Sequence, residues 1–147
     1  MGIPLGQAVG RTAKLVRQVG DRRLAALGAT VTDWILLLHI ADAAPPGLSQ
    51  AEVARFSDMS GPALVRHLDR MAEDGIIVRT RDVDDRRISR ITLTPAGHRR
   101  RDELRSVMED MDLELRSMLT ENEQRVMVKA LDKLFTWSLA ELQGKGE

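Results

Sequence analysis

Three histidines are the residues of this 147-residue chain that first suggest chemistry. His39, His67 and His98 lack a second histidine at the spacing of a helical metal site, and His98 with Asp102, four residues on, supplies only two ligands. The sequence has no cysteine, no phosphate loop, no nucleophile elbow and no dinucleotide fingerprint. We therefore expect no metal, no cofactor and no enzyme activity.

Arginine is the second candidate, and its distribution is uneven. The net charge is zero, but the stretch from Arg79 to Arg101 contains eight Arg and three Asp, a net charge of +5. The next stretch, Asp102 to Glu123, contains eight acidic residues and two Arg, a net charge of −6. A localised positive surface suits phosphates, and the guanidinium fork suits them better than an ammonium group does. A coding bias toward Arg explains the high ratio of Arg to Lys equally well.

Composition sets the class of protein that must position these residues. Hydrophobic residues make up 43% and charged residues 30%, which is typical of one globular domain. The longest strongly apolar run, Trp34 to Leu38, has five residues, whereas a membrane helix needs roughly 20. Gly6 stands where a myristoylation signal requires Ser or Thr. We expect a single-domain cytoplasmic protein with no membrane partner.

The first 47 residues predict two helices. Leu5, Val9, Val16 and Val19 form an apolar stripe at helical spacing. Thr30 and Asp33 then resemble a helix cap before a buried helix, which Pro45-Pro46-Gly47 ends.

The central residues predict two short helices and a hairpin. Ser49 and Glu52 have capping-box spacing, which starts a helix to about Phe56. A fourth helix is expected from Ser60 as its cap to Asp74, with Val65, Leu68 and Ala72 facing inward. Residues 76–78 and 88–93 read as strands, and the polar residues 82–86 as the tip between them.

Two long helices complete the pattern. Thr94-Pro95 opens the fifth helix, and Thr120 with Glu123 opens the last. Both carry apolar stripes: Leu104, Met108, Met111, Leu115 and Met118 on the fifth; Met127, Leu131, Leu134, Ser138 and Leu142 on the last. These stripes flank a module that closes its own core, so a second copy of the chain is the simplest partner for them.

The element order defines the fold class. We predict a mainly α (α+β) protein, a winged helix-turn-helix with amino- and carboxy-terminal dimerisation helices. The DNA-binding core is expected at residues 30–94, and the dimerisation helices at 1–27 and 95–147 of a single domain.

The fourth helix and the hairpin carry the candidate DNA-binding residues. Small residues beside an Arg allow a helix to enter the major groove, where Arg bonds guanine bidentately. In the hairpin, a carboxylate two residues from an Arg could hold that Arg extended for a narrow minor groove, although a simple surface ion pair is an equal alternative. The predicted contacts are Ser60, Gly61, Ala63, Arg66, His67, Arg70, Asp85, Arg86 and Arg87.

The segment LSQAEVARFSDMSGPALVRHLDRMAEDGIIVRTRDVDDRRISRITLTPAG resembles the winged-helix core of the MarR family of bacterial transcription regulators. Within the family it looks most like the SlyA-like regulators. The resemblance makes Arg66 the recognition-helix arginine and Asp85 with Arg87 the Asp-x-Arg pair of the wing. Asp84 with Arg86 also fits that pair, but only Arg87 stands six residues before Leu93, as the family pattern requires. The resemblance also implies a homodimer on a pseudo-palindromic operator.

Two features of the sequence bear on regulation. The turn between the central helices has Ser57 and Asp58 where the family usually has an apolar residue and Gly. Peroxide sensing through cysteine is excluded, because the chain has none. The resemblance implies release from DNA by a small aromatic ligand, and the residues predicted to bind it are Arg17, Trp34, Leu38 and His39. The alternative function is a winged-helix protein-interaction scaffold without DNA binding, which would not need Arg66 and Arg87.

Overall fold

The computed structural model describes residues 2–144, and the chain divides into two compact units. Of the described residues, those up to Met108 form the winged part, and those from Glu109 onward form the C-terminal part. The boundary falls inside a long helix, α5.

The helices of the winged part begin where the capping residues predict. Thr30 and Asp33 form a capping box at the start of α2, and Ser49 and Glu52 form another at the start of α3. Each box satisfies backbone N–H groups that the first helical turn leaves free. The elements are α1 (Leu5–Leu24), the 3-10 turn η1 (Ala25–Leu27), α2 (Val31–Asp42), α3 (Gln50–Ala54) and α4 (Gly61–Glu73).

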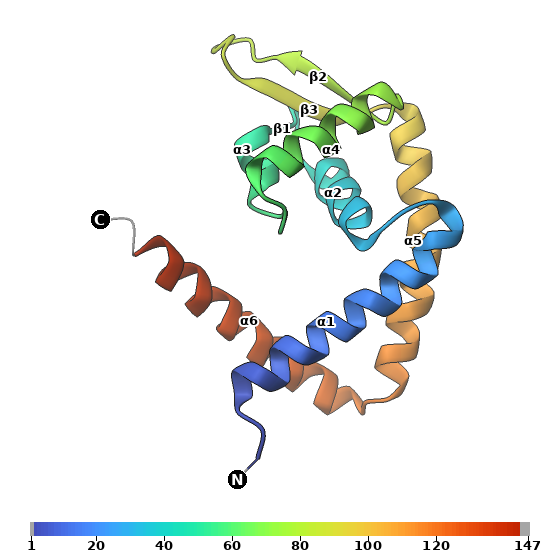
Figure 1. The fold of residues 1–147 in the computed structure, drawn as a ribbon, viewed down its shortest axis with the longest axis vertical. Helices are drawn as coiled ribbons and strands as arrows, with labels where there is room; N and C mark the ends of the chain where they lie inside the picture. Colours follow the sequence, from blue (N-terminus) through green and yellow to red (C-terminus); the bar gives the residue numbers. More distant parts are fainter. Residues whose placement is uncertain (1, 145–147) are drawn as a thin grey trace. The chain divides into compact units, whose positions relative to one another are not determined.

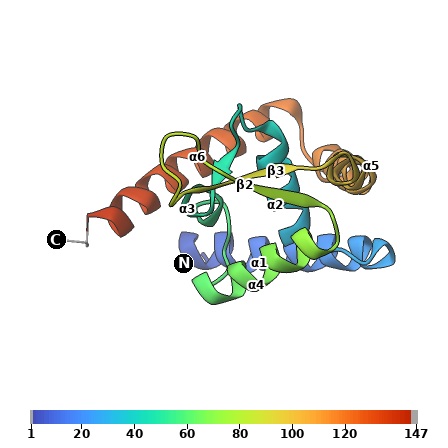
Figure 2. The same ribbon diagram turned by 90° about the horizontal axis from the view of Figure 1, so that it is seen from above.

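The sheet is small and antiparallel, with strand order β1-β3-β2. Strands β2 (Ile77–Arg81) and β3 (Ser89–Leu93) form the predicted hairpin. The third strand, β1 (Leu48–Ser49), was not predicted, because two residues are too short for an alternating pattern. In Figure 2 the two hairpin strands run side by side, with their joining loop at the opposite end from the first turn of α5.

The core of the winged part lies between these helices and the inner face of the sheet. Leu36 and Leu37 of α2, Leu68 of α4, Ile91 of β3 and Leu104 of α5 are all buried. The first turn of helix α5 (Pro95–Ser117) packs closely against Ile76, the residue before β2. A Cβ at position 97 would overlap the carbonyl oxygen of Ile76. Glycine is therefore the residue that fits there. In Figure 1, α4 and the hairpin lie at the same end of the winged part.

The C-terminal part contains the end of α5 and the whole of α6 (Glu121–Gln143). The predicted capping box of Thr120 and Glu123 forms at the start of α6. No described residue of α6 is buried. Its exposed large hydrophobic residues are Val126, Met127, Val128, Leu131, Phe135, Trp137, Leu139 and Leu142.

Among the described residues, no single helix is long and apolar enough to cross a membrane. Helices Leu5–Leu27 and Val31–Asp42 pass that test only as a pair, and the pair is bent by 83°.

Candidate nucleic-acid interface

Helix α4 presents one polar face and buries the other. Leu64, Leu68 and Met71, spaced four and three residues apart, are buried. The prediction that Val65 and Ala72 face inward is therefore wrong for Val65, which is 38% exposed, while Ala72 is only half-buried. Leu68 is buried as predicted, but Leu64 and Met71 are buried in place of Val65 and Ala72, because the larger Leu and Met side chains bury more apolar surface.

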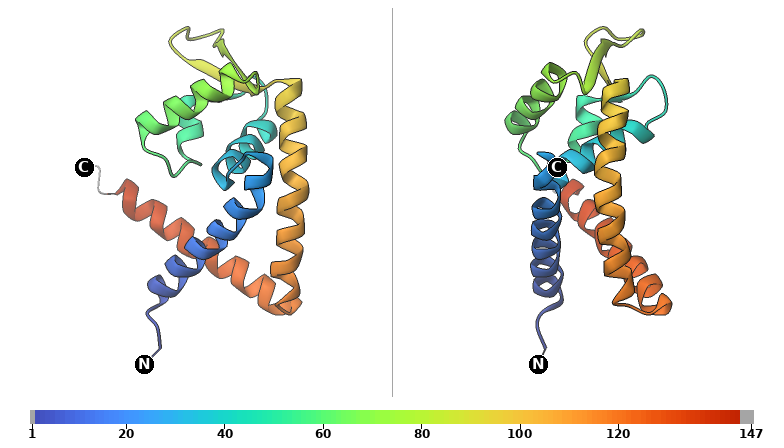
Figure 3. Two further views of the ribbon diagram at one scale, coloured as in Figure 1. Left: turned by 45° about the vertical axis from the view of Figure 1, so that its right-hand side comes forward. Right: turned by 90° about the vertical axis from the view of Figure 1, so that its right-hand side faces the viewer.

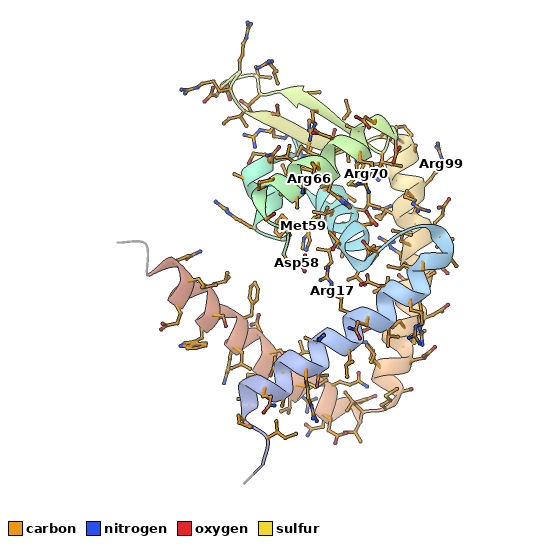
Figure 4. The ribbon with its side chains drawn as sticks, viewed as in Figure 1. Arg17, Asp58, Met59, Arg66, Arg70 and Arg99 are labelled. Atoms are coloured by element: carbon orange, nitrogen blue, oxygen red, sulfur yellow. The ribbon has the colours of Figure 1, made fainter. Side chains whose placement is uncertain are left out.

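The predicted contact residues on α4 divide into two groups. Ser60, Gly61, Arg66 and Arg70 are exposed, whereas Ala63 is half-buried. Ser60 stands at the predicted N-cap position but makes no side-chain capping hydrogen bond. Pro62 in the first turn has no N–H, so the helix start has one donor fewer to satisfy. The face that remains open carries Arg66 and Arg70, both marked in Figure 4.

His67 does not face solvent as predicted. Its Nε2 lies 2.8 Å from Oδ1 of Asp33, at the start of α2, and both side chains are largely covered. Burial would raise the pKa of Asp33, but hydrogen bonds from His67 and Thr30 hold that pKa below its ordinary value. His67 therefore fastens α4 to α2. Helix periodicity alone could not reveal this contact, since it depends on where α2 lies.

The hairpin loop, the wing, carries the expected carboxylate–arginine pair. Oδ1 of Asp85 accepts from Nε of Arg87 at 3.1 Å, and Oδ2 accepts from its Nη2 at 3.2 Å. The Arg87 side chain is 91% exposed. Among the described residues no such pair joins Asp84 to Arg86, whose side chain is also exposed. Figure 3 shows the wing at the end of the winged part away from the N-terminal end of α1. Its Arg87 is therefore accessible to a large partner.

Most arginines of the net-positive stretch are paired within the chain. Nη1 of Arg79 lies 2.6 Å from Asp69, and Arg100 and Arg101 pair with acidic residues of their own helix. Over residues 2–144, no described hydrogen bond or ion pair involves the guanidinium groups of Arg66, Arg70 or Arg86. Exposed Arg99 of α5 likewise has no partner among the described residues, so the positive charge that a phosphate could meet lies on α4, on the wing and at the start of α5.

Two residues at the base of the wing were not predicted as part of the site. Asp82 accepts hydrogen bonds from the backbone N–H groups of Asp84 and Asp85, and Arg90 Nε donates to it at 2.6 Å. An Asp that bonds backbone two and three residues later is a known turn former, so the sequence contained a signal for Asp82. The partnership with Arg90 depends on the strand register, which the sequence did not provide.

A cavity of about 550 Å³ lies within the winged part, lined by residues of α1, α2, α4 and α5. Arg17 lines it, bonding Thr32 at 2.5 Å and pairing with Asp58 at 3.1 Å. Figure 4 shows Arg17 and Asp58 pointing toward each other. The polar residue at the turn thus contacts the first helix.

The four residues predicted to bind a ligand do not share this cavity. Arg17 lines it, but Trp34, Leu38 and His39 do not. Trp34 packs against the core, and His39 stacks on Phe56 with ring centroids 4.1 Å apart. Helix α2 turns Leu37 toward the cavity instead of Leu38. Over the described chain, no group of three or more His, Asp or Glu could hold a metal ion.

Comparison with known proteins gives a family match for the central part of the chain. Residues 27–88 match the family model of the MarR family. The matched range contains the helix-turn-helix and strand β2 and ends just before strand β3, so the similarity to this family lies in the winged-helix core. A solved structure of a transcriptional regulator (MarR family) from Rhodococcus has a TM-score of 0.77 at 22% identity, with 88% of this chain and 92% of that chain covered.

Three solved structures illustrate the similarity. MepR of S. aureus, in a DNA complex, has a TM-score of 0.80 at 23% identity, with 92% of this chain and 98% of that chain covered. A mutant MarR of E. coli complexed with operator DNA has a TM-score of 0.78 at 25% identity, covering 90% and 94%. A MarR family protein of Mycobacterium tuberculosis in complex with salicylic acid has a TM-score of 0.72 at 28% identity, covering 90% and 97%.

Proposed function

We propose that this protein is a transcription regulator that binds double-stranded DNA through α4 and the wing. The observation that carries the proposal is the pair of accessible arginines on one rigid module: Arg66 on the exposed face of α4, and Arg87 extended from the wing by Asp85. Arg66 would read a base edge in the major groove, and Arg87 would enter the minor groove. The E. coli relative complexed with operator DNA supports this reading.

The remaining predicted contacts fit supporting roles. Exposed Ser60 and Gly61 lie at the start of α4, where backbone N–H groups favour a phosphate. Arg70 and Arg86 would add phosphate contacts, because neither guanidinium is paired within the described chain. His67 contributes indirectly, since its bond to Asp33 fixes the position of α4. That the chain is a SlyA-like member of the family remains part of this proposal.

The protein would act as a homodimer on a pseudo-palindromic site. Helix α6 exposes large apolar side chains along its length, and α1 exposes Leu5, Leu15 and Val19. Exposed apolar residues on this scale mark an association surface, and a two-fold interface is self-complementary. Two copies would place two α4 helices on one duplex.

A small aromatic acid would regulate this binding. The cavity contains Arg17, Arg70 and Arg100 together with the apolar Leu37, Met59 and Met71. An apolar lining with a few converging charged groups suits an aromatic carboxylate. The salicylic acid complex of the M. tuberculosis relative supports that ligand class. Binding there would compete with Asp58 for Arg17, and would thus alter the link between α1 and the turn before α4.

Selection of duplexes from a random-sequence pool by the purified protein tests the DNA proposal. We expect enrichment of one pseudo-palindromic sequence, whose binding to the wild type weakens steeply with salt. Failure to enrich any sequence would leave the scaffold function as the better explanation.

Salicylate binding, measured by calorimetry, tests the ligand proposal separately. Arg17→Met should weaken salicylate binding, whereas Lys14→Met, an exposed change on the same helix that does not line the cavity, should not. Salicylate and the selected duplex should weaken each other by the same factor, because coupling between two sites is reciprocal. Equal binding by both variants would reject this site.

A further inference from the structure

Arg87 is held by a single residue. Its side chain is 91% exposed, and its hydrogen bonds are to Asp85. Asp85 also accepts from the backbone N–H of Arg87 at 3.0 Å. The orientation of the guanidinium relative to the fold therefore depends on what fixes Asp85.

Asp82 fixes the backbone at Asp85. Oδ1 of Asp82 accepts from the N–H groups of Asp84 at 2.9 Å and Asp85 at 3.0 Å. The Asp82 side chain is only 10% exposed, although the loop around it is open to solvent. One carboxylate thus organises the turn that carries Asp85.

Arg90 ties Asp82 to the helix-turn-helix. Its Nε donates to Oδ2 of Asp82 at 2.6 Å, and its Nη1 lies 3.3 Å from Oε2 of Glu52. Glu52 is the capping-box residue of α3 and accepts from the N–H of Ser49 at 2.6 Å. Strand β1 adds backbone pairing at the same place, with Ser49 opposite Arg90. A continuous series of contacts therefore runs from α3 through Arg90 and Asp82 to the wing.

We propose that Asp82 and Arg90 are positioning residues that hold the wing against α3, so that Arg87 meets the minor groove in one orientation. The proposal rests on the proposed DNA-binding function and concerns how its wing is built. Arg90 faces two carboxylates, so its charge is compensated within the chain and it is not a phosphate ligand. Preorganisation of this kind raises affinity because less side-chain and loop freedom is lost on binding.

The titration of Asp82 agrees with this geometry. The hydrogen bond from Arg90, followed by those from the backbone of Asp85 and Asp84, lowers the pKa of Asp82 to about 2. The carboxylate is therefore charged throughout the neutral range and holds both partners there.

A double-mutant cycle with Arg87 tests the proposal on the duplex that the wild-type protein selects. Arg90→Met keeps the length of the side chain but removes its hydrogen bonds, and should weaken binding about two- to tenfold. In an Arg87→Ala background the same change should alter affinity by less than about 1.5-fold, since there is no longer an Arg87 to position. Asp82→Asn, which breaks the ion pair at its other end, should behave like Arg90→Met and serves if Arg90→Met fails to fold.

Arg86→Met is the matched control, because it removes one positive charge from the neighbouring position without touching Asp82 or Asp85. Its effect should persist in the Arg87→Ala background. Hydroxyl-radical footprinting adds a second measurement, because a loss of protein stability would lower protection over the whole DNA site and not in the minor groove alone. The Arg90→Met protein should fail to protect the same minor-groove positions of the DNA as the Arg87→Ala protein, and should still protect the rest of the site.

The outcomes separate this proposal from the proposed function. Equal losses from Arg90→Met with and without Arg87, or no loss in either, would overturn the positioning role while DNA binding stands. No effect of Arg87→Ala on the selected duplex would overturn the minor-groove role of the wing, and the positioning role with it.

Discussion

The winged part and the C-terminal part differ in how much of their apolar surface one chain can bury. The winged part encloses a core that includes Leu36, Leu68 and Ile91, all nearly inaccessible. Helix α6 has an equally regular apolar pattern, yet none of its described residues is buried, and Phe135 is 62% exposed. Similar hydrophobic periodicity thus has two different outcomes in this molecule: a closed core in one part, and an exposed apolar face in the other, which we propose as the dimer surface.

Removing residues from Thr120 onward should have the largest effect. The deletion removes α6 and with it the proposed dimer surface, so we expect an insoluble or monomeric product. For the full chain, folding and association should be one transition, whose midpoint rises with protein concentration. Sedimentation and thermal unfolding at several concentrations check both expectations. A stable, folded monomer of the full chain at micromolar concentration would contradict the proposal that the exposed apolar face of α6 forms a dimer interface.

A pair of truncations sharpens the same contrast. Leu68→Ala, in the closed core, should lower the free energy of unfolding by about 2 to 5 kcal/mol. Phe135→Ala should instead raise the dimer dissociation constant, by about tenfold or more if the ring is central to the interface. Lys133→Ala, an exposed charged position on the same helix, is the control. Denaturant titration and sedimentation equilibrium separate the two effects, and an unchanged dissociation constant for Phe135→Ala would place the interface elsewhere.

Two glycines distinguish close packing within the chain from packing against a partner. Gly97→Ala should destabilise the fold by about 1 to 3 kcal/mol, because the new methyl group meets the Ile76 carbonyl. Gly10→Ala, in the middle of α1 with open space around it, should stabilise the fold by roughly 0.5 to 1 kcal/mol through helix propensity. Thermal unfolding measures both. Destabilisation by Gly10→Ala would mean that a partner chain approaches α1 closely at that point.

The smallest expected effect is the acid sensitivity of the wing. The lowered pKa of Asp82, about 2 against an ordinary 3.8, means that its contribution to stability is present above the ordinary pKa and is lost as pH falls from about 4 toward 2. The difference in unfolding free energy between wild type and Asp82→Asn should therefore be constant near neutral pH and shrink over that range. Carboxyl NMR titration of Asp82 checks the value directly, and a midpoint near 3.8 would contradict the described contacts.

Local chemistry made much of the fold predictable. Three capping boxes, at Thr30, Ser49 and Thr120, form as their spacing predicts, and Gly75 ends α4 with a positive φ of 70°. These signals depend on residues a few positions apart, so the sequence contains them completely. Strand β1 was missed because it is defined by its pairing with β3 and not by its own two residues.

The contacts of the site were harder to predict, because several of them join residues far apart in the chain. The Asp85–Arg87 pair spans two residues and was expected. The contacts of His67 with Asp33, Arg17 with Asp58 and Arg90 with Glu52 span 34, 41 and 38 residues. Each depends on tertiary packing, which is why the sequence placed His67 in solvent and could not show its contact with Asp33.

Binding of the selected duplex and its single-base variants by the wild type, Arg66→Ala and Arg87→Ala tests the central claim most directly. Arg66→Ala should cost about 1 to 3 kcal/mol on the selected sequence and relax base preference at one position in each half-site. Arg87→Ala should weaken binding across all sequences. Unchanged affinity for both variants would contradict DNA recognition by α4 and the wing, and would favour a scaffold role.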